Sequence, residues 1–283
     1  MLYLILSIIC SVSVGVIFKI ARKHNVNIAQ IVAFNYITAV CLCFIILRPY
    51  IPVIDSSLPW HIYIPVSILL PSIFLFLALS IKHMGIVKTD AAQRMSLFIP
   101  ILAAWFIFGE QFNNYKWAGL AIGFPAIALI LYKKPDKTEN KWLYPAVVLL
   151  GFGIIDILFK QIVGIEIPYK TSLFLVLCGA LAVSWLFIFY SLAKGKRIKV
   201  ENVKFGLGVG ALNFGNILFY LMAHRDFSDN PSTVFASMNM GVIVLGSLVG
   251  ILAFKEKLSV INYVGIALAL CAIGLITLSQ IYA

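Results

Sequence analysis

Charged side chains inside long apolar runs are the first candidates for chemistry in this sequence. Arg94 opens one such run, and Asp90 precedes it by four residues. Asp156 and Lys160 are also four residues apart, within the run GFGIIDILFKQI. A spacing of four puts two side chains on one face of a helix. Each pair can therefore neutralise itself, or one of its members can bind or exchange something else.

Arg94 and Asp156 differ in the chemistry that they offer. A guanidinium donates paired hydrogen bonds, so Arg94 is predicted to hold a carboxylate or a phosphate. The alternative is that Arg94 extends to the end of its run and pairs with Asp90. Asp156 is predicted to exchange a proton or to bind a cationic part of a ligand, and the alternative is a structural pair with Lys160. Lys19 is expected to extend toward the end of the first run.

Amide and phenol groups in the same runs add hydrogen-bonding capacity. The predicted binding set consists of the two charged residues above and seven of these groups: Arg94, Asp156, Asn35, Tyr36, Gln93, Asn213, Asn216, Tyr220 and Asn239. Asn213 and Asn216 are three residues apart, which places both on one face of a helix. The alternative for each amide is a hydrogen bond between helices, because an unpaired amide in an apolar setting is costly.

Patterns for catalysis or metal binding are missing from the sequence. It has no H-E-x-x-H, and its four histidines are scattered near the ends of the runs. The five cysteines form no C-x-x-C and are expected to pack as small apolar residues. The stretch GFGIID differs from the Gly-x-Gly-Asp of intramembrane aspartyl proteases, since Asp156 comes two residues too late. We therefore predict no catalytic residue, no metal site and no cofactor.

Ten apolar runs carry these side chains and set the fold class. The sequence is 62% hydrophobic and 12% charged, whereas a soluble domain has about a quarter of its residues charged. Each run is close to the ~20 residues with which a helix crosses a bilayer, and none alternates like a membrane strand. The expected spans are 2–20, 28–47, 60–81, 89–108, 116–132, 142–163, 171–191, 205–223, 232–253 and 260–281. The sequence thus predicts an all-α, multi-pass integral membrane protein with ten transmembrane helices.

The net charge of +11 follows the order of these spans. Fifteen of the 22 Lys and Arg residues fall in one set of alternate connections, and the opposite set holds Arg48, Lys116, Lys170 and Arg225. An excess of Lys and Arg marks cytoplasmic loops. This bias predicts cytoplasmic loops after spans 1, 3, 5, 7 and 9 and both termini on the other face. The opposite orientation is the alternative, because ten-helix proteins built from inverted halves are near a topological balance. The bias explains the charge without nucleic acid, which is not expected as a partner.

An internal repeat relates the two halves of the chain. Residues 108–131 align without a gap with residues 254–277, at a shift of 146, and eight of the twenty-four positions are identical. Glu110 corresponds to Glu256 in this alignment. Further upstream, the correspondence is at a shift of 141, which pairs Lys19 with Lys160 and His83 with His224.

The repeat predicts the domain organisation. We expect a first five-helix repeat over residues 1–134, a charged linker over 135–141 and a second repeat over 142–283. Because five is odd, the second repeat must enter the membrane from the opposite face. This predicts two inverted bundles whose interface passes near the bilayer midplane, an arrangement typical of transporters.

Smaller features indicate how the helices meet. Glu110 and Glu256, at the ends of their spans, are expected to cap the next helix or to pair with loop cations. Pro100, in the middle of the fourth span, is expected to free a carbonyl and kink the helix. The Gly119-x-x-x-Gly123 motif and the stretch GLGVGALNFGN are expected to let helix backbones approach closely.

The spans, the 5+5 repeat and the Phe-x-Glu that closes each fourth span resemble the drug/metabolite transporter superfamily, in its EamA type. The motif stands here as FGEQFNNYKWAGLAIG and FKEKLSVINYVGIALA. The resemblance implies that helices 1–4 and 6–9 surround a central cavity and that helices 5 and 10 are peripheral. It also implies secondary transport of a small metabolite or amino acid by alternating access, with export as the expected direction.

The same resemblance implies the partners and the location. The expected partners are a small-molecule substrate and the lipid bilayer, and the chain is expected to work as a monomer or homodimer in a bacterial inner (cell) membrane. A passive channel or facilitator has the same composition as a carrier and is the main alternative. An intramembrane enzyme is a weaker alternative, because the sequence offers no catalytic constellation.

Overall fold

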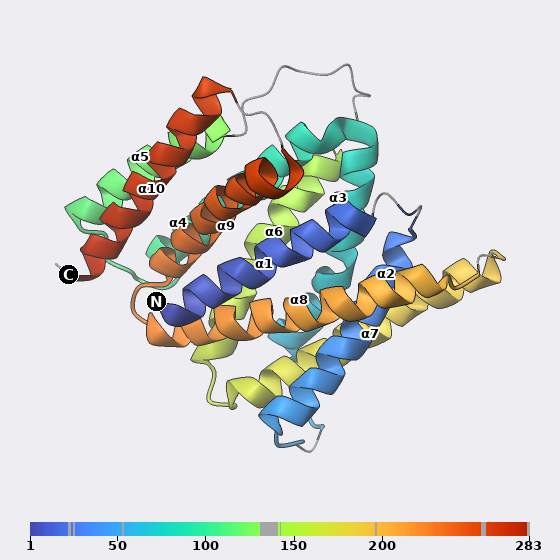
Figure 1. The fold of residues 1–283 in the computed structure, drawn as a ribbon. Coiled ribbons are helices and arrows are strands. Elements are labelled where there is room, and N and C mark those ends of the chain that lie inside the picture. The colour runs from blue at the N-terminus through green and yellow to red at the C-terminus, as the bar shows by residue number, and fades with distance from the viewer. Residues whose placement is uncertain are drawn as a thin grey trace.

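The computed structural model describes all residues except 22, 23, 25, 53, 131–140, 142, 196, 256–258, 282 and 283. The described residues form helices and no strand. The elements are α1 (Leu2–Ala21), α2 (Ile28–Leu42), the short π-helix η2 (Cys43–Leu47), α3 (Trp60–Met95), α4 (Phe98–Phe106), α5 (Asn114–Ile130), α6 (Leu143–Gly164), α7 (Tyr169–Ala193), α8 (Val200–Asp226), α9 (Pro231–Phe254) and α10 (Val260–Ile281). Figure 1 shows them as one bundle, with the two chain ends on the same side.

Eight helical segments in the described part of the chain are long and apolar enough to cross a membrane. They lie in α1, in α2 with η2, in the first part of α3, and in α6, α7, α8, α9 and α10. Large apolar side chains are exposed on the outside, such as Leu252 at 79% and Phe106 at 72%. Exposure of such a surface to water would be very unfavourable, whereas contact with the lipid tails of a bilayer is favourable. The chain is therefore a multi-pass integral membrane protein.

The prediction of a loop between the third and fourth spans, at residues 82–88, is wrong, because α3 continues as a helix from Trp60 to Met95. Residues 82–95 contain no proline and hold a continuous helical backbone. The break comes instead at Ser96 and Leu97, just before α4. Pro100 explains this position, since its ring clashes with the carbonyl of Ser96 and cannot donate a hydrogen bond to it. Figure 1 shows the α3 ribbon changing direction near the top of the view.

Helices α5 and α10 pack side by side and antiparallel, at the edge of the bundle (Figure 1). Their contact is reciprocal. A Cβ atom on Gly119 would lie 3.1 Å from the carbonyl oxygen of Ala272, and one on Gly265 would lie 2.9 Å from that of Ala126. Gly119 and Ala126 correspond to Gly265 and Ala272 at the shift of 146. The expected close approach at Gly119 is confirmed, and it requires a residue without a side chain.

The remaining helices form several further pairs. Helix α1 packs against α8 and α9, and α6 packs against α3 and α4. Helix α2 packs against α7 and α8, and α7 packs against α2 and α3. Glycines bring α8 close to α2, because a Cβ atom on Gly210 would lie 2.5 Å from the carbonyl oxygen of Asn35. The interior between these pairs is where the polar side chains of the spans meet.

Candidate functional site

Two adjoining cavities lie inside the bundle. The large cavity has a volume of about 510 Å³ and the small cavity about 140 Å³. Both are lined by Ser11, Phe74, Gln93, Arg94, Phe152, Asn213, Asn216 and Val242. The large cavity extends to Lys19, Ile28 and Phe254, which stand at the end of α1, the start of α2 and the end of α9. The small cavity continues in the other direction, to Asp156 and Tyr220.

The lining comes from both halves of the chain. Helices α1, α3, α6, α8 and α9 supply almost all of it, and α2 adds Ile28. Neither cavity is lined by a residue of α5 or α10. Helix α7 also lines neither of them, although the family resemblance implied a place for it around the cavity. It packs instead against α2 and α3.

Asp156 and Tyr220 form the floor of the small cavity. The phenolic hydroxyl of Tyr220 donates a hydrogen bond to Oδ1 of Asp156, with 2.8 Å between the oxygens. Lys160 turns away from this pair and donates to the carbonyl oxygen of Ser228, at 2.6 Å. The structure therefore does not join Asp156 to Lys160, and the carboxylate is left facing the cavity beside a phenol.

Arg94 and Gln93 line both cavities from the last turn of α3. The helix break that follows them is held by Ser96, whose hydroxyl donates to the carbonyl oxygen of Gln93 at 2.6 Å. The break at Ser96 thus sets where α3 ends and where the guanidinium stands. The side chain of Asp90, the expected partner of Arg94, lies outside the described part of the structure.

Three asparagines line the cavities from α8 and α9. Oδ1 of Asn216 accepts a hydrogen bond from the hydroxyl of Ser7, at 2.8 Å. Nδ2 of Asn239 donates to the carbonyl oxygen of Phe235, at 3.1 Å. Nδ2 of Asn213 is buried and has no hydrogen-bond partner in the structure. Since a buried amide without a partner is costly, Asn213 is the amide best suited to contact a ligand.

Asn35 and Tyr36 line neither of the two cavities. They lie in α2, with 1% and 0% of their surface exposed, where α8 approaches. Both amide atoms of Asn35 and the hydroxyl of Tyr36 lack a hydrogen-bond partner. Seven of the nine predicted binding residues thus line the cavities, and these two stand apart from them.

Sequence reasoning missed several lining residues. Ser11 and Thr89 add hydroxyls, and Phe18, Phe74 and Phe152 supply aromatic walls. Serine, threonine and phenylalanine are common in membrane helices, so their type gave no reason to single them out. Lys19 was expected only to extend outward, yet it lines the large cavity with its Nζ 3.8 Å from the ring centroid of Phe254.

Within the described residues, no group of three His, Cys, Asp or Glu side chains is placed to hold a metal ion. The cavities combine a guanidinium, a carboxylate, amides and hydroxyls with apolar walls, which suits binding of a small polar molecule by hydrogen bonds and charge.

Comparisons with known proteins decide the family. The sequence pattern of the EamA-like transporter family matches residues 1–132. The chain belongs to the EamA-like transporter family. An uncharacterized protein of Haemophilus influenzae is 41% identical to this EamA-like chain, in an alignment that covers 95% of each sequence. A solved crystal structure with 14% identity has a TM-score of 0.74, over 98% of this chain and 96% of the other, and so shares its fold.

Membership fixes the general activity of the molecule. This EamA-like chain is a membrane transporter for a small molecule, and the membrane-spanning helices described above agree with that activity. The EamA-like family is part of the drug/metabolite transporter superfamily, so the resemblance inferred from the sequence is confirmed.

Proposed function

We propose that this EamA-like chain is a secondary transporter that carries a small metabolite or an amino acid out of the cell by alternating access. The observation that carries the proposal is the pair of cavities, which gathers seven predicted binding residues between helices of both halves. A site between two halves can face either side of a membrane as the halves move against each other.

An inverted repeat of five plus five spans is part of the proposal. The reciprocal contacts of Gly119 and Gly265 support it, because they relate α5 and α10 by an approximate two-fold axis. The exchange of α1 and α6 supports it as well, since α1 meets α8 and α9 where α6 meets α3 and α4. In this proposal α4 and α5 complete the ten spans, with boundaries near 1–134 and 142–283.

The lining residues divide into three chemical roles. We assign to Arg94 the anionic group of the substrate, because a guanidinium donates paired hydrogen bonds to a carboxylate or phosphate. Asp156, held by Tyr220, takes a cationic or hydrogen-bond-donating group at the other end of the site. Gln93, Asn213, Asn216 and Asn239 supply hydrogen bonds between these ends. Asn35 and Tyr36 act indirectly, through the packing of α2 on α8.

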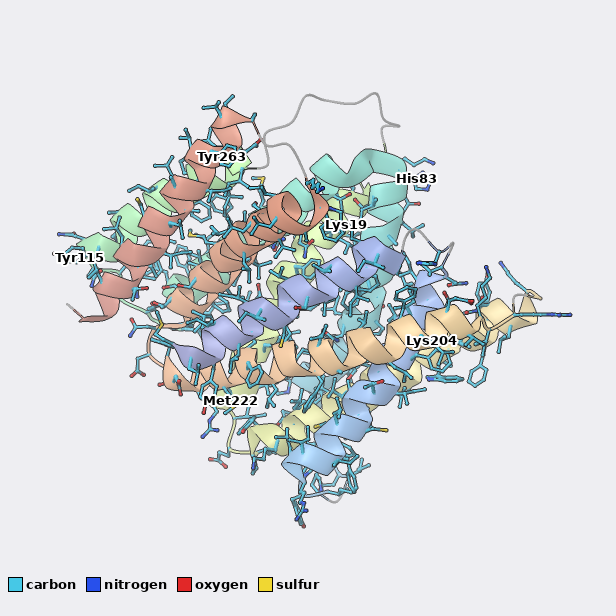
Figure 2. All side chains as sticks on the ribbon, in the orientation of Figure 1. Lys19, His83, Tyr115, Lys204, Met222 and Tyr263 are labelled. Atoms are coloured by element: carbon cyan, nitrogen blue, oxygen red, sulfur yellow. The ribbon has the colours of Figure 1, made fainter. Side chains whose placement is uncertain are left out.

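The face that the large cavity approaches supports export as the direction of transport. Lys19, Ile28 and Phe254 stand next to the connections that carry most of the Lys and Arg residues. In Figure 2, Lys204 and His83 mark that side at the right of the view, and Tyr115 and Met222 mark the other side. The basic side corresponds to the cytoplasm. A cavity on the cytoplasmic side supports loading from inside the cell, as an exporter requires.

The test is counterflow in sealed vesicles that contain the purified protein. Vesicles preloaded with an unlabelled pool of amino acids and small organic anions should take up a labelled member of that pool transiently, with saturation. A passive channel, or a facilitator that works as an open pore, is the second candidate and would give flux that does not saturate and shows no counterflow. Absence of any protein-dependent flux across the pool would count against transport of these classes.

Arg94 provides the residue-level arm of this test. Arg94→Gln should lower counterflow of a carboxylate or phosphate substrate by about tenfold or more, because one charge-assisted hydrogen bond to the substrate is lost. The matched control is Arg197→Gln, an exposed arginine outside both cavities, which should leave counterflow unchanged. Equal transport by the Arg94 and Arg197 variants would remove Arg94 from the site.

A further inference from the structure

A buried charged cluster lies near the face of the bundle opposite the basic face that the large cavity approaches. Nζ of Lys116 forms an ion pair with Oε1 of Glu110, and it also donates to Oδ1 of Asn230 at 2.9 Å. Glu110 accepts two further hydrogen bonds from Ser232, one from its backbone N–H at 2.8 Å and one from its hydroxyl at 2.6 Å. Glu110 and Lys116 are only 4% and 2% exposed.

The cluster joins the two halves of the chain. Glu110 lies between α4 and α5, and Lys116 lies in the first turn of α5. Asn230 and Ser232 stand at the start of α9, where free N–H groups favour a carboxylate. Lys160 holds the same segment from α6, through the carbonyl oxygen of Ser228. We call Glu110, Lys116, Asn230 and Ser232 the latch.

The repeat relates two neighbours of the latch, Phe108 and Lys160, to residues that line the large cavity. Phe254, which corresponds to Phe108 just before Glu110, lines the large cavity. Lys19 corresponds to Lys160 and also lines the large cavity. Lys160, by contrast, is 8% exposed and fixed to Ser228. Corresponding residues of the repeat, such as Lys19 and Lys160, therefore line a cavity near one face and form a buried contact near the other.

Neither substrate binding in the cavities nor a gain in stability explains the latch. None of its residues lines either cavity. A buried ion pair is also a poor way to gain stability, because removing two charges from water costs about as much as their attraction returns. Such a pair does, however, impose one specific arrangement on the segments that it joins, and breaking it leaves a buried charge without compensation.

We propose that the latch is the closed gate on the non-cytoplasmic face, and that its opening exposes the cavities to that face. The proposal rests on the alternating-access mechanism above. In the described conformation the Glu110 carboxylate ties α9 to the α4–α5 connection, while the large cavity approaches the basic face. Separation of Glu110 from Ser232 frees the start of α9, and the cavities then communicate with the opposite side.

The experiment measures from which side the cavity is reached. Ser11→Cys places a thiol on a residue that lines both cavities, in a chain whose five native cysteines are replaced by alanine. A membrane-impermeant maleimide is added to intact cells, which exposes the non-cytoplasmic face, and separately to inverted vesicles. With the latch intact, labelling should be faster from the basic face, in inverted vesicles.

Two latch variants and one control complete the design. The double change Glu110→Gln with Lys116→Met breaks the ion pair without leaving a lone buried charge, and should raise labelling from the non-cytoplasmic face by about tenfold. Ser232→Ala removes one hydrogen bond only, and should give a smaller rise in the same direction. The control Glu201→Gln makes the same change of charge as Glu110→Gln at an exposed site on α8 and should change nothing.

The outcomes separate this inference from the proposed function. A rise in both latch variants that follows the order above supports the gate. Unchanged sidedness in either variant, when that variant elutes as a single folded species in detergent, overturns it. The labelling needs no substrate, so a failure to find transport in vesicles would count against the proposed function and leave the labelling result intact.

Discussion

Tyr220 on α8 donates its phenolic hydroxyl to Asp156 on α6, with 2.8 Å between the two oxygens. The two residues are 64 positions apart in the chain and meet where the small cavity ends. The bond holds Oδ1 of the carboxylate against the phenol. A donor and an acidic acceptor are thus placed together in the lining of the small cavity.

Removal of the phenolic hydroxyl tests this pair. Tyr220→Phe should lower counterflow by about tenfold, because a hydrogen bond to a charged group contributes about 1.5–3 kcal/mol. Tyr190→Phe, at a tyrosine that is 63% exposed, makes the same chemical change away from the cavities and should have no effect. Counterflow with saturating unlabelled substrate inside the vesicles measures both. Equal rates for the two variants would show that the Tyr220 hydroxyl is dispensable.

Removal of the carboxylate charge is a separate prediction. Asp156→Asn keeps the size of the side chain and an oxygen that can accept from Tyr220, so the fold should be retained. Counterflow should fall by at least about tenfold, since a charged contact or an exchangeable proton is lost. Asp55→Asn, in the exposed connection before α3, is the matched control. Wild-type transport by the Asp156 variant would leave the residue with a structural role only.

Asn213 should show a trade between stability and transport. Its buried Nδ2 has no hydrogen-bond partner, so Asn213→Leu should raise the free energy of unfolding by about 1 kcal/mol while transport falls. Asn202→Leu should have the opposite effect on stability, because Nδ2 of Asn202 donates to Oε1 of Gln30 at 2.6 Å. Thermal unfolding in detergent, with counterflow on the same preparations, measures both effects. A destabilised Asn213→Leu variant would contradict the prediction.

The glycines between α5 and α10 give a graded prediction for stability. A Cβ atom on Gly265 would stand 2.7 Å from the backbone nitrogen of Ile130, whereas one on Gly119 would stand 2.7 Å from the side chain of Ile276, which can move. Gly265→Ala should therefore cost more than Gly119→Ala, within about 1–3 kcal/mol.

Gly274 is the internal control for that series. It lies in the same helix, α10, and a Cβ atom there would meet nothing within 4 Å. Gly274→Ala should be neutral or should stabilise by up to about 1 kcal/mol, from helix propensity alone. Midpoints of thermal unfolding rank the three variants. A midpoint for Gly265→Ala equal to that for Gly274→Ala would mean that the α5–α10 contact is looser than described.

Much of the helical framework could be predicted from the sequence, because each apolar run must satisfy its own backbone hydrogen bonds in lipid. The close approach at Gly119 followed from the spacing of the glycines. The continuation of α3 to Met95 could not be predicted from hydropathy, since residues 82–91 are more polar but contain nothing that stops a helix. The position of the break depends on Pro100 and the carbonyl of Ser96, which is a backbone effect rather than a polarity effect.

The partners of the buried charges were the least predictable part. Asp156 and Lys160 share a helix face, and the structure nonetheless gives them separate partners on α8 and before α9. Glu110 was expected to cap the next helix or to pair with a loop cation. It instead binds Lys116, in the first turn of α5, and caps α9, a helix more than a hundred residues away. Contacts at that separation depend on the packing of the halves, which local patterns do not encode.

Helices α5 and α10 touch each other through backbone and leave the cavities to the other helices. Substitutions that adapt the cavity to a new compound can therefore accumulate without loosening this paired edge, and substitutions at the edge need not alter which compound is accepted. Changes in the substrate that is bound and changes in the α5–α10 contact can therefore evolve separately.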